Sequence, residues 1–330
     1  MKWTTIWSHA QRGIAHHTDS KGEIQLTIRQ IAPVEKIRLV FANEYGIQEQ
    51  SIRNLSFKTN DNCHTIPDFS VIPGEIVKTP PIIIDHEAKK WTLTYQSSPM
   101  ESGFSTNDAD FLAAAQVSDF CSGLIAIEAE TIGHCVIAFG DSLTEGATWT
   151  APLQRKLRKQ NLYLVNQGIN GSCLLKSTSD VPENGSQNLF YGYNSLQRLQ
   201  GCFASHNNVS KVILFIGIND LINGELTLEK FQTEIKRLTQ LCEKHKIAYQ
   251  LCTLTPCLGY PGMDEAKEKV RKTINAWLAE KYDNLWDFSA FVGEEGALKA
   301  KFDSGDRLHI NAIAGLAIAR HISSDFVKGE

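Results

Sequence analysis

The residues best able to do chemistry are a serine, an aspartate and a histidine on widely separated segments. Ser142 directly follows a short apolar run, where an open α/β sheet places its chemistry at the carboxyl end of a strand. Asp306 and His309 lie three residues apart near the end of the sequence. A serine hydroxyl is a poor nucleophile unless a nearby base takes its proton, and a neutral imidazole held by a carboxylate can do so. These three residues predict an acyl-transfer site that cleaves esters.

Each of these residues also has a structural alternative. Ser142 can be an ordinary helix cap, because Gly, Asp and Ser are common in the turn before a helix. His309 can begin a helix without any chemical role, since Asn311 is a good cap for that helix. Asn219 and Asp220 follow an apolar run and can form a turn or a cap, and we expect Asp220 to be structural. The presence of all these segments in one chain favours the chemical interpretation.

The sequence resembles the SGNH hydrolases, also called the GDSL family, whose functional residues lie on separate sequence blocks. The resemblance covers roughly residues 133–330, and the matching segments are Gly140-Asp-Ser-Leu143, Asn166-Gln-Gly-Ile-Asn-Gly171, Gly217-Ile-Asn-Asp220 and Asp306-Arg-Leu-His309. It implies a carboxylic ester hydrolase in which Ser142 is the nucleophile, His309 the base and Asp306 its orienting carboxylate.

The resemblance also implies three donors for the oxyanion that forms when the serine attacks: the backbone N–H groups of Ser142 and Gly171 and the side-chain amide of Asn219. Losing one such donor typically costs about 3–4 kcal/mol. A glycine suits position 171 because a missing Cβ lets the main chain approach the substrate closely. Gly168 is the competing glycine in the same segment. We prefer Gly171 because family members place the donor glycine five residues after the asparagine of that segment.

The character of the sequence changes near residue 131. Before it, apolar and polar residues alternate in short segments such as 24–29, which predicts an antiparallel β-sandwich, jelly-roll-like, over residues 1–131. After it, short continuous apolar runs alternate with helical periods such as 228–245. The predicted fold class is α/β, with a flavodoxin-like core of parallel strands between helices over residues 132–330, preceded by the sandwich.

Composition excludes several classes of protein. A chain of 330 residues with 42% hydrophobic content can bury a full core. The net charge of -4 provides no basic field for nucleic acid, and we expect the basic cluster at 155–159 to be a solvated helix face. No apolar stretch reaches the roughly 18–20 residues that cross a membrane. The sequence carries no indication of oligomeric state.

The eight cysteines fall at scattered spacings, several within apolar runs, and we expect most to be buried free thiols in a reducing compartment. Cys252 and Cys257 can be mistaken for a metal pair, but no second pair or nearby histidine completes a tetrahedral site, so we expect no metal. The start of the chain lacks the apolar length of a signal peptide. Cytoplasmic residence is therefore expected, and secretion is the alternative if an export signal is absent from this sequence.

No motif for a nucleotide, flavin or metal is visible, so we expect no cofactor and a small-molecule or carbohydrate ester as the binding partner. A subgroup of SGNH hydrolases with an amino-terminal β-sandwich, which the segments 253–256 and 286–288 resemble, includes enzymes acting on acylated carbohydrates. That resemblance implies a short acyl group, acetyl, on a sugar. The chain departs from the subgroup in having Ile310, where members usually have proline after the histidine.

Substrate contacts are the least specific part of the prediction. We name Asp141, Tyr191 and Tyr260 as candidates, and Trp149 and Tyr193 are further aromatic residues that can serve as a carbohydrate platform or simply as packing. Segment 177–193, rich in Ser, Asn and Gly, is expected to border the site. Three other functions stay open: a lysophospholipase or thioesterase for longer acyl chains, an acyltransferase, and a non-catalytic protein that binds carbohydrate or a partner.

Overall fold

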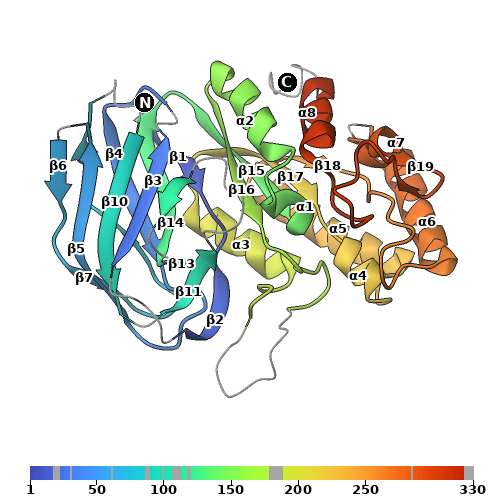
Figure 1. Cartoon of the computed structure of the whole chain (residues 1–330), viewed down its shortest axis with the longest axis horizontal. Helices are drawn as coiled ribbons and strands as arrows, with labels where there is room; N and C mark the ends of the chain where they lie inside the picture. The colour runs from blue at the N-terminus through green and yellow to red at the C-terminus, as the bar shows by residue number, and fades with distance from the viewer. Residues whose placement is uncertain are drawn as a thin grey trace.

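A computed structural model describes residues 1–17, 23–29, 32–60, 62–85, 90–98, 100–105, 113–116, 120–177, 189–283 and 285–322. Figure 1 shows a layered, strand-rich amino-terminal region beside a region in which helices surround a second sheet. The amino-terminal region ends with β14 at Thr131, and the first strand of the second region, β15, begins at His134.

The amino-terminal region is built from antiparallel sheets. One sheet has the order β1-β14-β4-β8 with β9 beside β4, another has β12-β3-β10-β5-β6 with β7 beside β5, and a third has β13-β11-β2. The strands are β1 (Lys2–Ser8), β2 (Arg12–His17), β3 (Ile24–Arg29), β4 (Lys36–Ala42), β5 (Gln50–Thr59), β6 (Asn62–Thr65), β7 (Phe69–Val71), β8 (Ile76–Lys78), β9 (Ile82–Ile83), β10 (Lys90–Ser97), β11 (Met100–Ser105), β12 (Ala113–Gln116), β13 (Phe120–Ser122) and β14 (Leu124–Thr131).

The core of this region lies between the first two sheets. Alternate residues along each strand point to the same face of a sheet, so an apolar residue at every second position builds one buried layer. Leu26 of β3 and Leu93 of β10 are buried in one sheet and meet Leu39 of β4 in the other. The antiparallel sandwich predicted from the alternating pattern is therefore confirmed.

The second region contains a parallel sheet in the order β16-β15-β17-β18. The chain runs from β15 to its neighbour on one side, β16, and then crosses to the other side of β15 to form β17. Loops that leave the carboxyl ends of β15 and β17 therefore diverge, and α/β proteins bind their ligands at such a point. The flavodoxin-like core is also confirmed.

The elements of this region are β15 (His134–Gly140), α1 (Ser142–Glu145), α2 (Thr150–Leu157), a 3₁₀ turn (Arg158–Gln160), β16 (Leu162–Gly168), α3 (Ser195–Ser205), β17 (Val209–Phe215), α4 (Ile218–Ile222), α5 (Leu228–Lys244), β18 (Ala248–Leu251), α6 (Glu265–Lys281), α7 (Phe288–Val292), β19 (Gly293–Glu294), β20 (Ala297–Leu298) and α8 (Ala312–His321). Helix α2 packs against α8, and α3 packs against α5. None of the described helices is long and apolar enough to cross a membrane.

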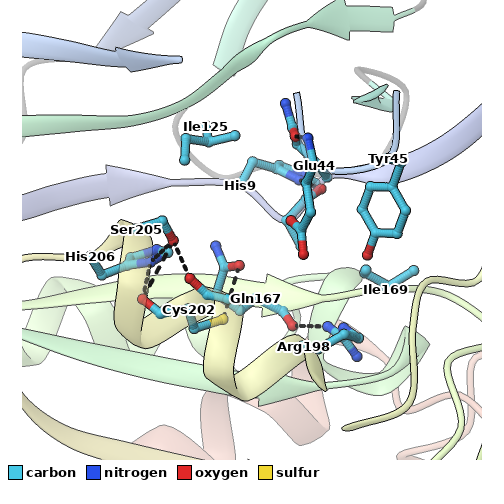
Figure 2. Close-up of a pocket in the computed structure, with 13 residues that line it drawn as sticks. His9, Glu44, Tyr45, Ile125, Gln167, Ile169, Arg198, Cys202, Ser205 and His206 are labelled. Carbon is cyan, nitrogen blue, oxygen red and sulfur yellow. Dashed lines mark hydrogen bonds between the residues drawn. The ribbon is translucent and has the colours of Figure 1, made fainter. Parts of the chain in front are cut away.

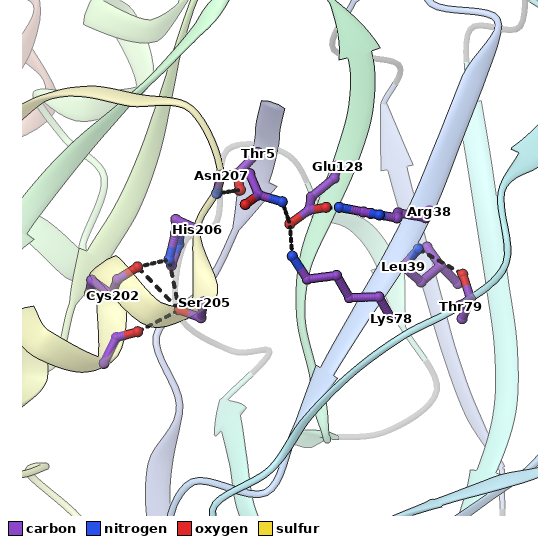
Figure 3. A network of polar contacts seen from close by, with 11 residues as sticks. Thr5, Arg38, Leu39, Lys78, Thr79, Glu128, Cys202, Ser205, His206 and Asn207 are labelled. Carbon is purple, nitrogen blue, oxygen red and sulfur yellow. Dashed lines mark hydrogen bonds and ion pairs between the residues drawn. The ribbon is translucent and has the colours of Figure 1, made fainter. Parts of the chain in front are cut away.

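The two regions share a continuous polar interface. Asn207, just after α3, donates its backbone N–H to Thr5 of β1 at 2.9 Å and its side-chain amide to Glu128 of β14 at 2.8 Å (Figure 3). Further along β1, the hydroxyl of Ser8 lies 2.6 Å from Nε2 of His206. These hydrogen bonds replace contacts with water on the surfaces of both regions. Together with the surface buried around them, they hold the sandwich against the parallel sheet.

Candidate active site

Ser142, His309 and Asp306 form a hydrogen-bonded chain. The hydroxyl oxygen of Ser142 lies 2.8 Å from Nε2 of His309, and Nδ1 of His309 lies 2.5 Å from Oδ2 of Asp306. Ser142 is the first residue of α1, two residues after the end of β15, whereas the other two precede α8. The parallel sheet thus brings together residues 167 positions apart in the sequence. This arrangement can move a proton from the hydroxyl to the imidazole while the carboxylate holds the other ring N–H.

The loop that carries His309 is held at both ends. Asp303 accepts the backbone N–H groups of Gly305 and Arg307 at 2.8 and 2.9 Å. Asn311 accepts the N–H groups of Ile313 and Ala314 at the start of α8, as the sequence predicts for a cap, and donates its amide to the carbonyl of Asp303. A loop tied down in this way orients the imidazole before any substrate arrives.

The carboxyl group of Asp306 stays ionised in this setting. Burial alone would raise its pKa, but hydrogen bonds from the His309 ring and from the backbone N–H groups of His309 and Leu308 outweigh burial and lower it to about 2. The carboxylate is therefore an acceptor at neutral pH, as a residue that fixes the histidine tautomer must be.

Two backbone N–H groups, those of Ser142 and Gly171, differ from their neighbours in their hydrogen bonding. Within the described ranges, no residue accepts a hydrogen bond from the N–H of Ser142 or of Gly171. The competing glycine is different, because the N–H of Gly168 donates to the side chain of Asn166 at 2.9 Å. Gly171 has a φ of +75°, and a Cβ there would lie 2.4 Å from the ring of Tyr191. Only glycine fits this position without strain.

Asn219 lies in α4, which follows β17. One of its amide hydrogens is donated to the carbonyl of Ser172 at 2.9 Å, and the same NH₂ group carries a second hydrogen. The next residue, Asp220, is buried and accepts the N–H groups of Leu174 and Leu175 at 2.7 and 2.9 Å. Asp220 is therefore structural, as expected, and it fixes α4 to the segment that follows Gly171.

The side chain of Arg198 in α3 hydrogen-bonds to the carboxyl ends of two parallel strands, β15 and β16. Its guanidinium donates to the carbonyl of Gly140 at 3.1 Å, to the carbonyl of Gln167 at 2.5 Å and to the hydroxyl of Ser172 at 2.6 Å. Figure 2 shows Arg198 at the edge of a cavity of about 30 Å³, with Glu44 and Tyr45 of the amino-terminal region facing it. This cavity is too small to hold an ester substrate.

The three residues predicted to contact substrate differ in burial and in their neighbours. Asp141 is only 1% exposed and caps α1 by accepting the N–H of Leu143. Burial raises the pKa of its carboxyl to about 7. Its contact with substrate stays a prediction. Tyr191 is half-buried and lies against Gly171. Tyr260 is half-buried beside Gly259, whose carbonyl meets Arg307 of the histidine loop.

The remaining aromatic candidates pack against other aromatic rings. Trp149 is fully buried against Phe215 and Phe288, so it offers no platform for a substrate. Tyr193 stacks on Tyr45 of the amino-terminal region, with ring centroids 4.7 Å apart. Of the segment predicted to border the site, residues 178–188 lie outside the described residues.

The eight cysteines are free thiols, and all except Cys63 are buried, as expected. The part of the chain that the structure describes contains no cluster of three or more His, Cys, Asp or Glu side chains able to hold a metal ion.

The sequence patterns did not identify two buried charged residues, Arg198 and Glu145, that hydrogen-bond to segments near Ser142. Arg198 shares the buried face of α3 with Leu199 and Cys202, so its phase in the helical repeat could have marked it as an internal residue. Glu145 is also buried, and its Oε2 accepts the N–H of Asn170 at 2.6 Å. No local pattern distinguishes that glutamate from an exposed one in the first turn of a helix.

The chain belongs to the GDSL-like lipase/acylhydrolase family, whose model matches residues 138–314, more than half of the sequence. It is therefore a carboxylic ester hydrolase. The match includes the segments that carry Ser142, Gly171, Asn219, Asp306 and His309. No curated protein sequence matches the chain.

Several solved structures are similar to this one. A carbohydrate acetylesterase family member from Sinorhizobium meliloti is 17% identical, with 59% of this chain and 99% of that chain covered and a TM-score of 0.46. A second carbohydrate acetylesterase from the same organism is 15% identical, with 59% and 99% covered and a TM-score of 0.47. A psychrotrophic esterase from a Pseudoalteromonas species is 18% identical, with 59% and 97% covered and a TM-score of 0.43.

Proposed function

We propose that this protein hydrolyses short-chain carboxylic esters, with O-acetyl groups on a carbohydrate as its substrate class, through an acyl-enzyme on Ser142. The observation that carries the proposal is the hydrogen-bonded chain Ser142–His309–Asp306. The backbone N–H groups of Ser142 and Gly171, which have no acceptor among the described residues, support it. In the same proposal, residues 1–131 form an accessory domain and residues 132–330 the catalytic domain.

The chemistry follows from the positions of these groups. The hydroxyl of Ser142 attacks the ester carbonyl as its proton passes to Nε2 of His309. The oxyanion accepts hydrogen bonds from the N–H groups of Ser142 and Gly171 and from the amide of Asn219. Collapse of the tetrahedral intermediate breaks the bond to the leaving alcohol, which takes the proton from the imidazolium. Water then repeats the sequence, with His309 as its base, and releases the acid.

The exposure of the site supports a small acyl group on a large alcohol. The side chains of His309 and Asp306 are 35% and 44% exposed, so the reacting atoms lie near the surface. A bulky sugar can approach such a site, whereas a long acyl chain needs an apolar channel to bury it. The rings of Tyr191 and Tyr260 are half-buried and are candidates to stack against a sugar.

One observation favours a second candidate, hydrolysis of longer acyl chains. Helix α8 starts just after His309 and exposes Ile313 (63%) and Leu316 (39%) to solvent. Apolar side chains next to an ester-cleaving site can bind the methylene groups of an acyl chain, at roughly 0.8 kcal/mol for each group that they bury.

A series of p-nitrophenyl esters from acetate to decanoate distinguishes these two functions. We expect kcat/KM to be highest for acetate or propionate and to fall as the chain lengthens, and we expect acetylated oligosaccharides to release acetate. A maximum at octanoate or decanoate that is lost in the paired variant Ile313→Ser/Leu316→Ser would contradict the proposal and support the second candidate.

Replacing Asn219 by alanine should lower kcat by about 10²–10³-fold while KM changes little, because an oxyanion donor acts mainly in the transition state. Asn223→Ala is a matched control, since Asn223 caps the other end of α4 and is exposed. Steady-state kinetics with p-nitrophenyl acetate check both variants. A loss confined to KM in Asn219→Ala would remove this residue from the oxyanion site.

A further inference from the structure

The amino-terminal sandwich reaches the catalytic region through a buried ion pair. Arg12, the first residue of β2, pairs with Glu145 of α1, and both side chains are only 3% exposed. Glu145 is three residues after Ser142. An ion pair removed from water in this way requires close geometry on both sides, so each partner restricts where the other can lie.

The same glutamate holds the segment of Gly171. Its Oε2 accepts the backbone N–H of Asn170 at 2.6 Å, and Asn170 directly precedes Gly171. A hydrogen bond from a backbone amide to a buried carboxylate is among the stronger ones in proteins. Arg12 therefore fixes the glutamate, and the glutamate fixes the peptide next to Gly171.

A second route leads from β2 to the same glycine. The N–H of Gly13 donates to the carbonyl of Leu189 at 3.0 Å, and the guanidinium of Arg12 lies 5.0 Å from the ring centroid of Phe190. Phe190 contacts Tyr191 edge to face, with ring centroids 5.5 Å apart, and the ring of Tyr191 lies against Gly171. The start of β2 thus contacts Glu145, which accepts the Asn170 N–H, and the segment that leads into Tyr191.

We propose that Arg12 is a positioning residue for ester hydrolysis, through which the amino-terminal sandwich sets the orientation of the Gly171 N–H. The sandwich is then part of the active-site framework in addition to any contact that it makes with substrate. This inference rests on the proposed function, because it assigns the Gly171 N–H to the oxyanion.

The test is Arg12→Gln in the full chain, assayed with p-nitrophenyl acetate well below the melting temperature of each variant. We expect kcat to fall by about 10–100-fold, since small misplacements of catalytic groups have effects of this size. KM should change by less than about threefold. The inhibition constant of phenylboronic acid, which forms a tetrahedral adduct with a catalytic serine, should rise in parallel with the loss of kcat. A purely structural role would lower the melting temperature and leave this inhibition constant unchanged.

Arg38→Gln is the matched control. Arg38 pairs with buried Glu128 at 2.5 Å, and Glu128 keeps Lys78 and Asn207 as partners in the network away from the site (Figure 3). We expect the kcat of Arg38→Gln to lie within about twofold of the wild-type value. In the double variant Arg12→Gln/Glu145→Gln, the glutamine at 145 carries no charge and still offers an oxygen to Asn170, so part of the lost kcat should return.

Two variants distinguish a failure of this inference from a failure of the proposed function. Ser142→Ala with full activity would overturn the proposed function and the inference together, whereas inactive Ser142→Ala beside Arg12→Gln with wild-type kcat and boronate inhibition would overturn the inference alone. If Arg12→Gln does not fold, the double variant is assayed in its place. Hydrogen exchange at the Asn170 amide of the wild-type protein gives an independent result: we expect strong protection, and exchange as fast as in an exposed loop would contradict the inference.

Discussion

Ser142→Ala should lower kcat for p-nitrophenyl acetate by about 10⁴-fold or more, because no other group in the proposed mechanism can form the acyl-enzyme. Among the described residues, the hydroxyl of Ser142 has a hydrogen bond only with the imidazole of His309, so we expect its removal to leave the packing of α1 unchanged. We therefore expect a wild-type melting temperature.

Ser210→Ala provides the control for this loss. Ser210 lies near the amino end of β17, at the opposite end of the sheet, where its hydroxyl donates to the carbonyl of Cys135 at 3.3 Å. Its kcat should equal that of wild type within about twofold, as for most surface substitutions. Equal activity in Ser142→Ala and Ser210→Ala would remove Ser142 from the mechanism.

His309→Gln should cause a loss of similar size, about 10⁴-fold or more in kcat, since glutamine can neither take the proton of Ser142 nor return it to the leaving alcohol. The matched control is His245→Gln, because His245 is an exposed histidine at the end of α5. Rates measured with both variants separate a base at position 309 from a general effect of losing an imidazole.

The pH dependence of the wild-type rate tests the carboxylate that orients this base. Hydrogen bonds lower the pKa of Asp306 to about 2, so its carboxylate stays ionised and accepts the imidazole N–H at neutral and mildly acid pH. Burial raises the pKa of Asp141, the residue before Ser142, to about 7. A plot of log kcat/KM against pH should therefore show no protonation of Asp306 at mildly acid pH.

Much of the fold could be predicted from the sequence because each region has one dominant hydrophobic period. Alternation at Leu26 and Ile28 predicts strands with one buried face, and the continuous apolar run before Gly140 predicts a strand covered on both faces. The order of the strands could not be predicted in this way. The pairing of β1 with β14, more than a hundred residues later, depends on contacts across the whole region, which no local pattern records.

The residues of the candidate site also differ in how well the sequence predicts their positions. Ser142, Asp306 and His309 lie in short segments with a recognisable composition, and their proximity follows from the parallel sheet. Trp149 was a candidate for exposure, but its burial follows from Phe215 and Phe288 on other elements, and a tryptophan looks the same in sequence whether buried or exposed. Partners that come from a different region, as Arg12 does for Glu145, are visible only in three dimensions.

The position of the covalent intermediate tests the central claim most directly. The protein is treated with a p-nitrophenyl phosphonate, which leaves a stable adduct on a nucleophile that attacks it, and is then digested and mapped by mass spectrometry. We predict one adduct per chain on the peptide that contains Ser142, and none in the His309→Gln variant over the same time. Rapid labelling of another residue, or full esterase activity in protein whose Ser142 is modified, would contradict the account.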